Sequence, residues 1–119
     1  MSNIELPIIY KYFGDYTNNN HHTGVICVAS QLNKDKKLLK LGASFCSPKD
    51  IFLKDKAKTI AKGRLLKEKT CFHFHFAPSF KINHDNLNKL IVQLIDLLPK
   101  YPRTNWSKKL VNQILKEIQ

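Results

Sequence analysis

The sequence has few of the residues on which most enzyme motifs depend. Only nine residues are acidic and four are glycine, and the glycines are scattered, so no glycine-rich phosphate loop is encoded. No apolar stretch approaches the length of a membrane span. The segment 1–11 has no cationic flank before a long apolar run, so we expect no secretory signal. We therefore expect a cytoplasmic protein that does not enter a membrane.

Cysteine is also scarce. Cys27, Cys46 and Cys71 are odd in number and lie in apolar, strand-like runs, which favours reduced, buried thiols over a disulfide framework. None of them opens a helix, where its pKa would be lowered, so no activated thiol nucleophile is expected. Cys71 shares a predicted strand face with His73 and His75, but a zinc site needs three or four converging ligands. We expect ordinary strand histidines and no metal site.

Positive charge is the feature that the chain has in excess. Twenty Lys and Arg residues against nine Asp and Glu give a formal net charge of +11. Such an excess repels itself unless an anionic partner offsets it, so phosphate is the first partner to consider. A lysine-rich surface that is merely solvated is the other explanation of this charge. Because no convincing nucleophile, base or metal set is present, we expect a binding protein that needs no cofactor, and not an enzyme.

Alternating apolar residues predict a small sheet. The 43% hydrophobic fraction is enough for one core, so we expect 1–119 to form a single ligand-binding domain. The β-branched runs 24–32 and 38–46, joined by the turn NKDKK, predict a β-hairpin. Strict alternation over 70–76 predicts a third strand, and 8–13 is a candidate fourth. The expected fold is α+β, with an antiparallel sheet of three to four strands.

A basic helix is predicted to follow the hairpin. Ser47 reads as its cap and Pro48 as its first helical residue, with the end near Lys67. Its apolar stripe is thin and lysines crowd the remaining surface, so the helix should be partly exposed and strongly cationic. The predicted stripe consists of Ile51, Ala57, Ile60, Ala61 and Leu65.

Two amphipathic helices are predicted near the carboxyl end. They span about 85–98 and 105–118, and the turn PKYPR separates them. His84 and Asp85 are candidates for capping the first of them. Both helices need an apolar surface to cover, and the phenylalanine face of the sheet supplies it.

Aromatic residues leave a second kind of partner open. Cationic residues alternate with aromatics that could stack bases on an open sheet, so single-stranded nucleic acid is the alternative partner. Phe72 and Phe74 are better explained as core beneath the two late helices. Phe76 ends its strand just before a proline, where a ring can reach the rim and stack on a purine.

One segment resembles a known family. The stretch 43–65, ASFCSPKDIFLKDKAKTIAKGRL, is similar to a block of small phage proteins in the Thoeris anti-defence family, sponges that capture glycocyclic ADP-ribose. In that family, a GASFCSPKD-like strand end leads into a helix that ends K-x-K-x-I-A-x-G-R-L. The layout is similar over most of the chain, from an HHTGV-like start of the hairpin to an Arg-bearing turn between the last helices. At the start of the hairpin, this chain has His21 and His22 at a position where an arginine could contact the ligand.

The resemblance implies a function. It implies a homo-oligomer, a dimer or larger, in the host cell cytoplasm that buries a cyclic ADP-ribose isomer at subunit interfaces without cleaving it. The host Thoeris effector would then not be activated. Whether a cyclic oligonucleotide binds at a second site is left open. The alternative is a basic phage protein that binds single-stranded nucleic acid.

The resemblance also implies which residues bind the ligand. Phe76 would stack on the base, Asn86 would contact its polar edge or the ribose, and Arg103 with Thr104 would hold phosphate. Arg103 is one of only two arginines, and a planar, bidentate donor suits phosphate better than lysine does. The other arginine, Arg64, follows Gly63 near a predicted helix end. Its positive charge either caps that helix end or contributes to a second nucleotide pocket.

Overall fold

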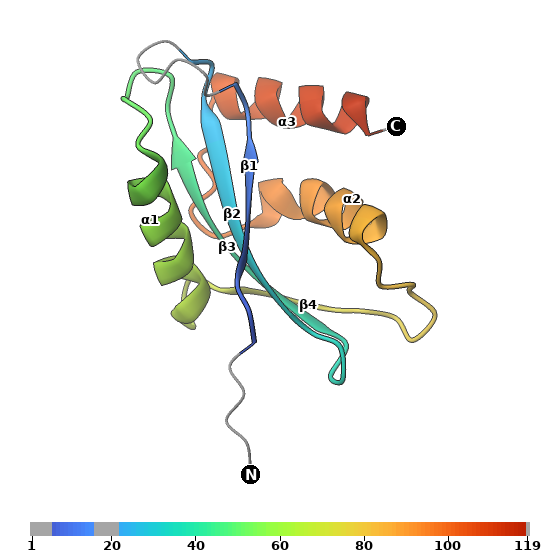
Figure 1. Cartoon of the computed structure of the whole chain (residues 1–119). Helices are drawn as coiled ribbons and strands as arrows, with labels where there is room; N and C mark the ends of the chain where they lie inside the picture. Colours follow the sequence, from blue (N-terminus) through green and yellow to red (C-terminus); the bar gives the residue numbers. More distant parts are fainter. Residues whose placement is uncertain (1–5, 16–21, 119) are drawn as a thin grey trace.

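The computed structural model describes residues 6–15 and 22–118, which form a four-stranded antiparallel sheet and three α-helices (Figure 1). The sheet has the order β1-β2-β3-β4. The elements are β1 (Ile9–Phe13), β2 (Val25–Asn33), β3 (Leu38–Cys46), α1 (Lys54–Leu66), β4 (Phe72–His75), α2 (His84–Leu94), the 3₁₀ turn η1 (Ile95–Leu97) and α3 (Asn105–Glu117). The α+β prediction is confirmed. Within these ranges, no helix is long and apolar enough to cross a membrane.

The sheet is covered on both faces, by α1 on one side and by α2 and α3 on the other (Figure 1). Successive residues of a strand point to opposite faces, so a strand buried on both sides carries apolar residues throughout. In β2, Val25 and Cys27 pack in the cluster that contains α1, whereas Ile26 and Val28 pack in the cluster of α2 and α3. The hairpin is therefore as predicted. The faces of β4 are also as predicted, because its phenylalanines pack in the cluster of α2 and α3 while His73 and His75 are exposed on the opposite face.

The predicted start of the basic helix was wrong. Ser47 begins a turn, in which its carbonyl oxygen accepts a hydrogen bond from the Asp50 N–H at 3.0 Å. The chain then stays extended while Phe52 enters the core with 2% of its surface exposed, and α1 begins only at Lys54. Ile51, expected in the buried stripe, is 62% exposed. Burial of Phe52 requires the extended backbone, which overrides the local helix-start signal.

The later helices differ from the predictions in detail. α2 ends at Leu94 and continues as the single 3₁₀ turn η1, whereas α3 begins where it was predicted. The cap of α2 is Asn83, whose Oδ1 accepts a hydrogen bond from the Asn86 N–H at 2.9 Å. The prediction that His84 or Asp85 provides this cap was wrong, because both lie inside the helix.

α1 packs unusually close to β3. A Cβ atom on Gly42 would lie 2.3 Å from the backbone nitrogen of Leu65 and 2.7 Å from the carbonyl oxygen of Ala61. The Arg64 guanidinium adds a hydrogen bond of 2.7 Å from its Nη1 to the Ala43 carbonyl oxygen. A glycine on the strand and an arginine on the helix therefore hold the two backbones together.

We predict opposite effects from two glycine substitutions. Gly42→Ala should lower the free energy of unfolding by about 1 to 3 kcal/mol, because the new methyl group meets helix backbone that cannot move aside. Gly63→Ala, inside α1 and with nothing within 4 Å of an added Cβ, should raise it by about 0.5 to 1 kcal/mol. Urea denaturation measures both, and equal shifts in one direction would contradict the close packing.

Candidate functional site

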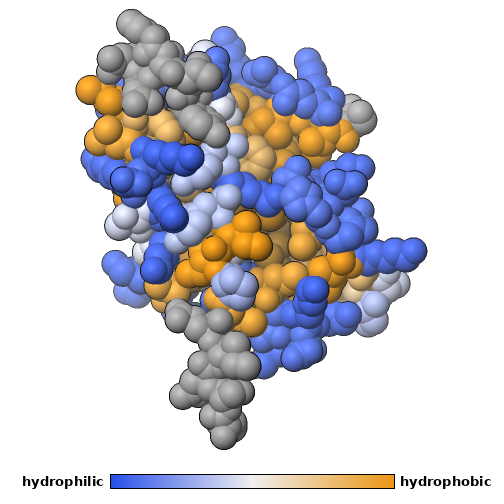
Figure 2. Space-filling model, in the orientation of Figure 1, coloured by the Kyte–Doolittle hydropathy of each residue, from blue (hydrophilic) through white to orange (hydrophobic). Residues whose placement is uncertain are grey.

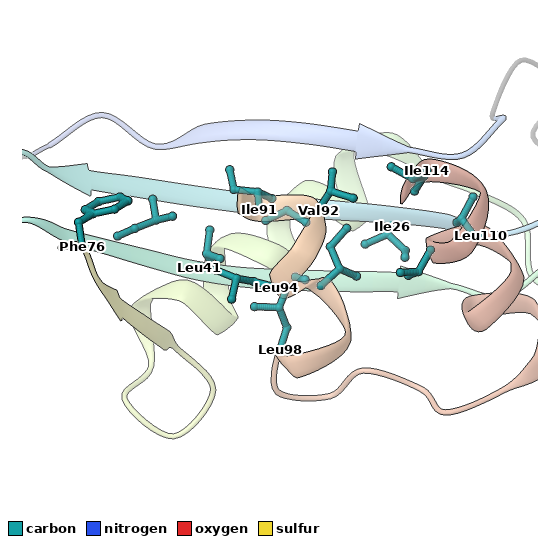
Figure 3. Close-up of a cluster of buried hydrophobic side chains, with 14 residues drawn as sticks. Ile26, Leu41, Phe76, Ile91, Val92, Leu94, Leu98, Leu110 and Ile114 are labelled. Carbon is teal, nitrogen blue, oxygen red and sulfur yellow. The ribbon is translucent and has the colours of Figure 1, made fainter. Parts of the chain in front are cut away.

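Phe76, predicted to stack on a base, is a core side chain. It is 6% exposed, and its ring stacks on that of Phe80 with centroids 4.9 Å apart. Figure 3 places it at one end of the apolar cluster, with Leu110 of α3 at the other end. Phe80 is the more exposed ring of this pair, and a base that stacks on Phe76 would have to displace it. The sequence did not indicate that Phe80 covers Phe76.

Asn86 and Arg103 lie at opposite ends of α2. Asn86 is in the first turn of this helix, where its Nδ2 donates a hydrogen bond of 2.9 Å to the Lys81 carbonyl oxygen. Arg103 is exposed in the connection that follows η1 and precedes α3 (Figure 1). A helix of 11 residues is about 16 Å long. One chain therefore does not bring these two predicted ligands together.

Thr104, predicted beside the phosphate, caps α3. Its backbone N–H donates to the Ser107 hydroxyl at 3.2 Å, and the two hydroxyl oxygens lie 3.1 Å apart. Ser107 is fully buried and also donates to the Pro102 carbonyl oxygen. This network fixes the backbone that carries Arg103, so the arginine projects from an ordered turn.

Arg64 lies in the last turn of α1, where charge capping expects a basic residue, and it has a further structural role. Its guanidinium is half-buried against β3, and burial lowers the pKa of Arg64 from its ordinary value. The hydrogen bond to the Ala43 carbonyl oxygen directs this charge toward the sheet. A role for Arg64 in a second nucleotide pocket stays a prediction.

A cavity of about 460 Å³, which we name the α3 pocket, lies at the start of α3. It offers a broad aromatic ring from Trp106, side-chain amides from Asn105 and Gln113, and an ammonium group from Lys109. The other lining residues are His22, Thr23, Pro48 and Leu110. The part of the lining that comes from α3 begins just after Arg103 and Thr104 in sequence. Of the lining residues, the sequence pointed to His22 as a candidate for the ligand site, but not to Asn105, Trp106, Lys109 or Gln113.

Trp106 is held in place by a glycine. Gly24, at the start of β2, has a φ of +107°, and a Cβ there would lie 2.2 Å from the indole ring. The half-buried indole therefore lies directly against the backbone of Gly24. A side chain at this position would both strain the backbone and push the ring out of the pocket wall.

His22 forms another wall of the α3 pocket and is buried. Its Nδ1 accepts a hydrogen bond from the Gly24 N–H at 3.1 Å, so the proton resides on Nε2, which donates to the Asp50 carbonyl oxygen at 2.6 Å. Both ring nitrogens are engaged with backbone, and His22 is not placed as an arginine substitute. His21 lies outside the described residues.

A thiol lies beside this histidine, but the pair is not arranged for nucleophilic catalysis. Cys46 Sγ is 3.8 Å from His22 Nε2, and that nitrogen already directs its proton to the Asp50 carbonyl oxygen. Burial, reinforced by the negative charge of Asp50, raises the pKa of the Cys46 thiol. A nucleophilic thiol needs the opposite arrangement. The neighbouring base must have a nitrogen free to accept the thiol proton, and the surroundings must stabilise the thiolate and so lower its pKa.

The remaining candidates for chemistry are equally unsuited. Burial raises the pKa of Cys27 to about 11 and also raises that of Cys71. Over the described ranges, no group of three or more His, Cys, Asp or Glu side chains could hold a metal ion. His73 and His75 are exposed on the outer face of β4.

The aromatic residues of the sheet are covered. The ammonium groups of Lys54 and Lys58 of α1 lie 4.9 Å and 4.8 Å from the ring centroids of Tyr12 and Tyr10. The phenylalanines of β4 pack against the cluster that contains α2 and α3. The open stacking surface expected for single-stranded nucleic acid is therefore not formed by these residues.

Comparisons with known proteins add no relative. The chain matches no family profile, no curated protein and no solved structure. Its similarity to the Thoeris anti-defence block over 43–65 stays a prediction. The features of the molecule that bear on function are the residues of the α3 pocket and of the connection before α3.

Proposed function

We propose that this protein binds a phosphate-bearing nucleotide of the cyclic ADP-ribose type and holds it without cleaving it. The observation that carries the proposal is the composition of the α3 pocket. An indole ring can stack on adenine, side-chain amides can pair with the base edge or with ribose hydroxyls, and an ammonium can meet a phosphate. The resemblance over 43–65 narrows the ligand class and supports a sponge that keeps the signal from the Thoeris effector.

Arg103 supplies the phosphate contact in this proposal. It is exposed in the segment that the Thr104–Ser107 network orders, two residues before Asn105, which lines the α3 pocket. A guanidinium fork binds two phosphate oxygens at once, and an ordered turn reduces the entropy lost on binding. The formal charge of +11 adds long-range attraction for any anion.

A site shared between two copies reconciles the separated residues. Asn86 lies in the first turn of α2, and Arg103 lies in the connection between η1 and α3, beyond the other end of that helix (Figure 1). In a two-fold dimer, the start of α2 in one copy can lie against the connection that carries Arg103 in the partner. Figure 2 shows apolar patches between hydrophilic side chains on the face that carries β1, and such patches favour association.

Single-stranded nucleic acid is the second candidate. The excess of lysine supports it, because backbone phosphates bind clustered cations without sequence preference. The coverage of Tyr10 and Tyr12 by lysines of α1 argues against base stacking on the sheet. Electrostatic binding alone would therefore have to supply the affinity.

We predict that Arg103→Ala weakens binding of a cyclic ADP-ribose isomer by about 30-fold or more, since a charge-assisted contact to a desolvated phosphate is worth at least ~2 kcal/mol. Lys109→Gln, within the α3 pocket, should weaken it by about tenfold. Lys108→Gln, exposed and outside the pocket, is the matched control and should retain the affinity. Calorimetric titration measures the affinities, and thermal melts check that each variant is folded.

Two results would go against this assignment. Full affinity in Arg103→Ala would place the phosphate elsewhere, with the lysine-rich α1 as the next candidate. Tight binding of single-stranded DNA that falls steeply with salt, with no response to cyclic ADP-ribose isomers, would favour the nucleic-acid function.

We predict that two variants with weakened binding, Asn86→Ala and Arg103→Ala, regain full-affinity sites when they are mixed. If each site takes Asn86 from one copy and Arg103 from the other, a mixed dimer of Asn86→Ala and Arg103→Ala has one intact site. Equal mixing after subunit exchange should recover about a quarter of the wild-type sites. Titration of the mixture counts them. No recovery, from variants that exchange subunits, would show that the site is not shared.

A further inference from the structure

A second cavity, of about 600 Å³, lies between the end of β3, the segment 47–53 and the start of α1. We name it the β3–α1 cavity. Its lining is Ser44, Phe45, Cys46, Lys49, Asp50, Ile51, Phe52, Leu53, Lys56, Ala57 and Ile60. Unlike the α3 pocket, it has no side-chain amide to read the edge of a base. Its walls combine apolar side chains with two lysines, one aspartate and a serine.

The apolar part of this cavity is exposed to water. Because the backbone is extended before α1, Phe52 points into the core while its neighbours point away from it. Ile51 and Leu53 are 62% and 54% exposed, and Ile60 is half-buried beside them. A ligand with an apolar body would remove this surface from water, which favours binding.

The charge of the cavity favours an anion. Lys49 and Lys56 line it together with one carboxylate, that of Asp50. Lys56 lies close enough to Cys46 for its positive charge to oppose the rise in the thiol pKa. Leu53, at the cap position of α1, has no side-chain acceptor for the first N–H groups of the helix, so their partial positive charge adds to that of the lysines.

We propose that the β3–α1 cavity binds a small amphipathic anion, an aryl or acyl group that carries one acidic group. The apolar body lies on Ile51, Leu53 and Ile60, and the acidic group lies between Lys49 and Lys56. This site is separate from the nucleotide site proposed above. The walls offer no side-chain amide that could pair with a donor and an acceptor of a base edge together, whereas a hydrocarbon body needs no such partner.

The test uses anilinonaphthalene sulfonate, an aryl anion whose fluorescence rises in apolar surroundings. The full chain should bind one equivalent. Lys56→Gln should weaken binding by about fivefold and Ile60→Trp, which fills the cavity, by more than about tenfold. Lys62→Gln, on the same helix but outside the cavity, is the matched control and should bind as the wild type does.

A thiol probe gives a second readout that does not depend on fluorescence. In a Cys71→Ala background, Cys46 is the accessible thiol because Cys27 is fully buried. The aryl sulfonate should slow alkylation of Cys46, whereas AMP, as a nucleotide probe, should not. This readout also tests the proposal if Ile60→Trp fails to fold.

Several outcomes would overturn the proposal. The first is that the wild-type chain does not bind the aryl sulfonate. The second is that Lys56→Gln and Ile60→Trp bind it as tightly as the wild type, and the third is that Lys62→Gln loses as much affinity as these two variants do. Displacement of the aryl sulfonate by AMP or by a cyclic ADP-ribose isomer would make the cavity part of a nucleotide site. Arg103→Ala should keep full binding of the sulfonate, so failure of the nucleotide function is distinguished from failure of this one.

Discussion

Both cavities depend on the hydrogen bonds of one buried histidine. His22 accepts from the Gly24 N–H and donates to the Asp50 carbonyl oxygen, and thereby fixes the segment 47–53 against the start of β2. That segment contributes Pro48 to the α3 pocket and a whole wall to the β3–α1 cavity. Since buried polar groups without partners are costly, the neutral imidazole has little freedom to leave this position.

The fold shows which sequence signals are reliable. Strict alternation over 70–76 predicted β4, because this strand has one face against the core and one exposed face. The apolar, β-branched runs of the hairpin predicted β2 and β3, because both faces of these strands meet a core. The start of α1 was not predictable from local signals. Ser47 followed by proline is compatible with both a helix cap and a turn, and only the burial of Phe52 decides between them.

The site was less predictable than the fold. The resemblance put Arg103 forward as a phosphate ligand, and the rarity of arginine in a chain dominated by lysine supported that prediction. The structure shows that Arg103 is exposed, and its binding of a ligand stays a prediction. Trp106 was predicted only as an inward-facing residue of its helix, which is confirmed, and its place in a pocket wall was not predicted, although it is the sole tryptophan and lies three residues after that arginine. The contact between His22 and Asp50 spans 28 residues and follows no periodicity, so no pattern in the sequence could indicate it.

The central claim is that the protein holds a nucleotide signal intact, and the released ligand tests it most directly. The complex formed with a cyclic ADP-ribose isomer is separated from free ligand and denatured by heat, and the supernatant is analysed by mass spectrometry. The account predicts recovery of the unchanged cyclic nucleotide, because the Cys46–His22 pair lacks both a stabilised thiolate and a free base. Recovery of a linear product would contradict it.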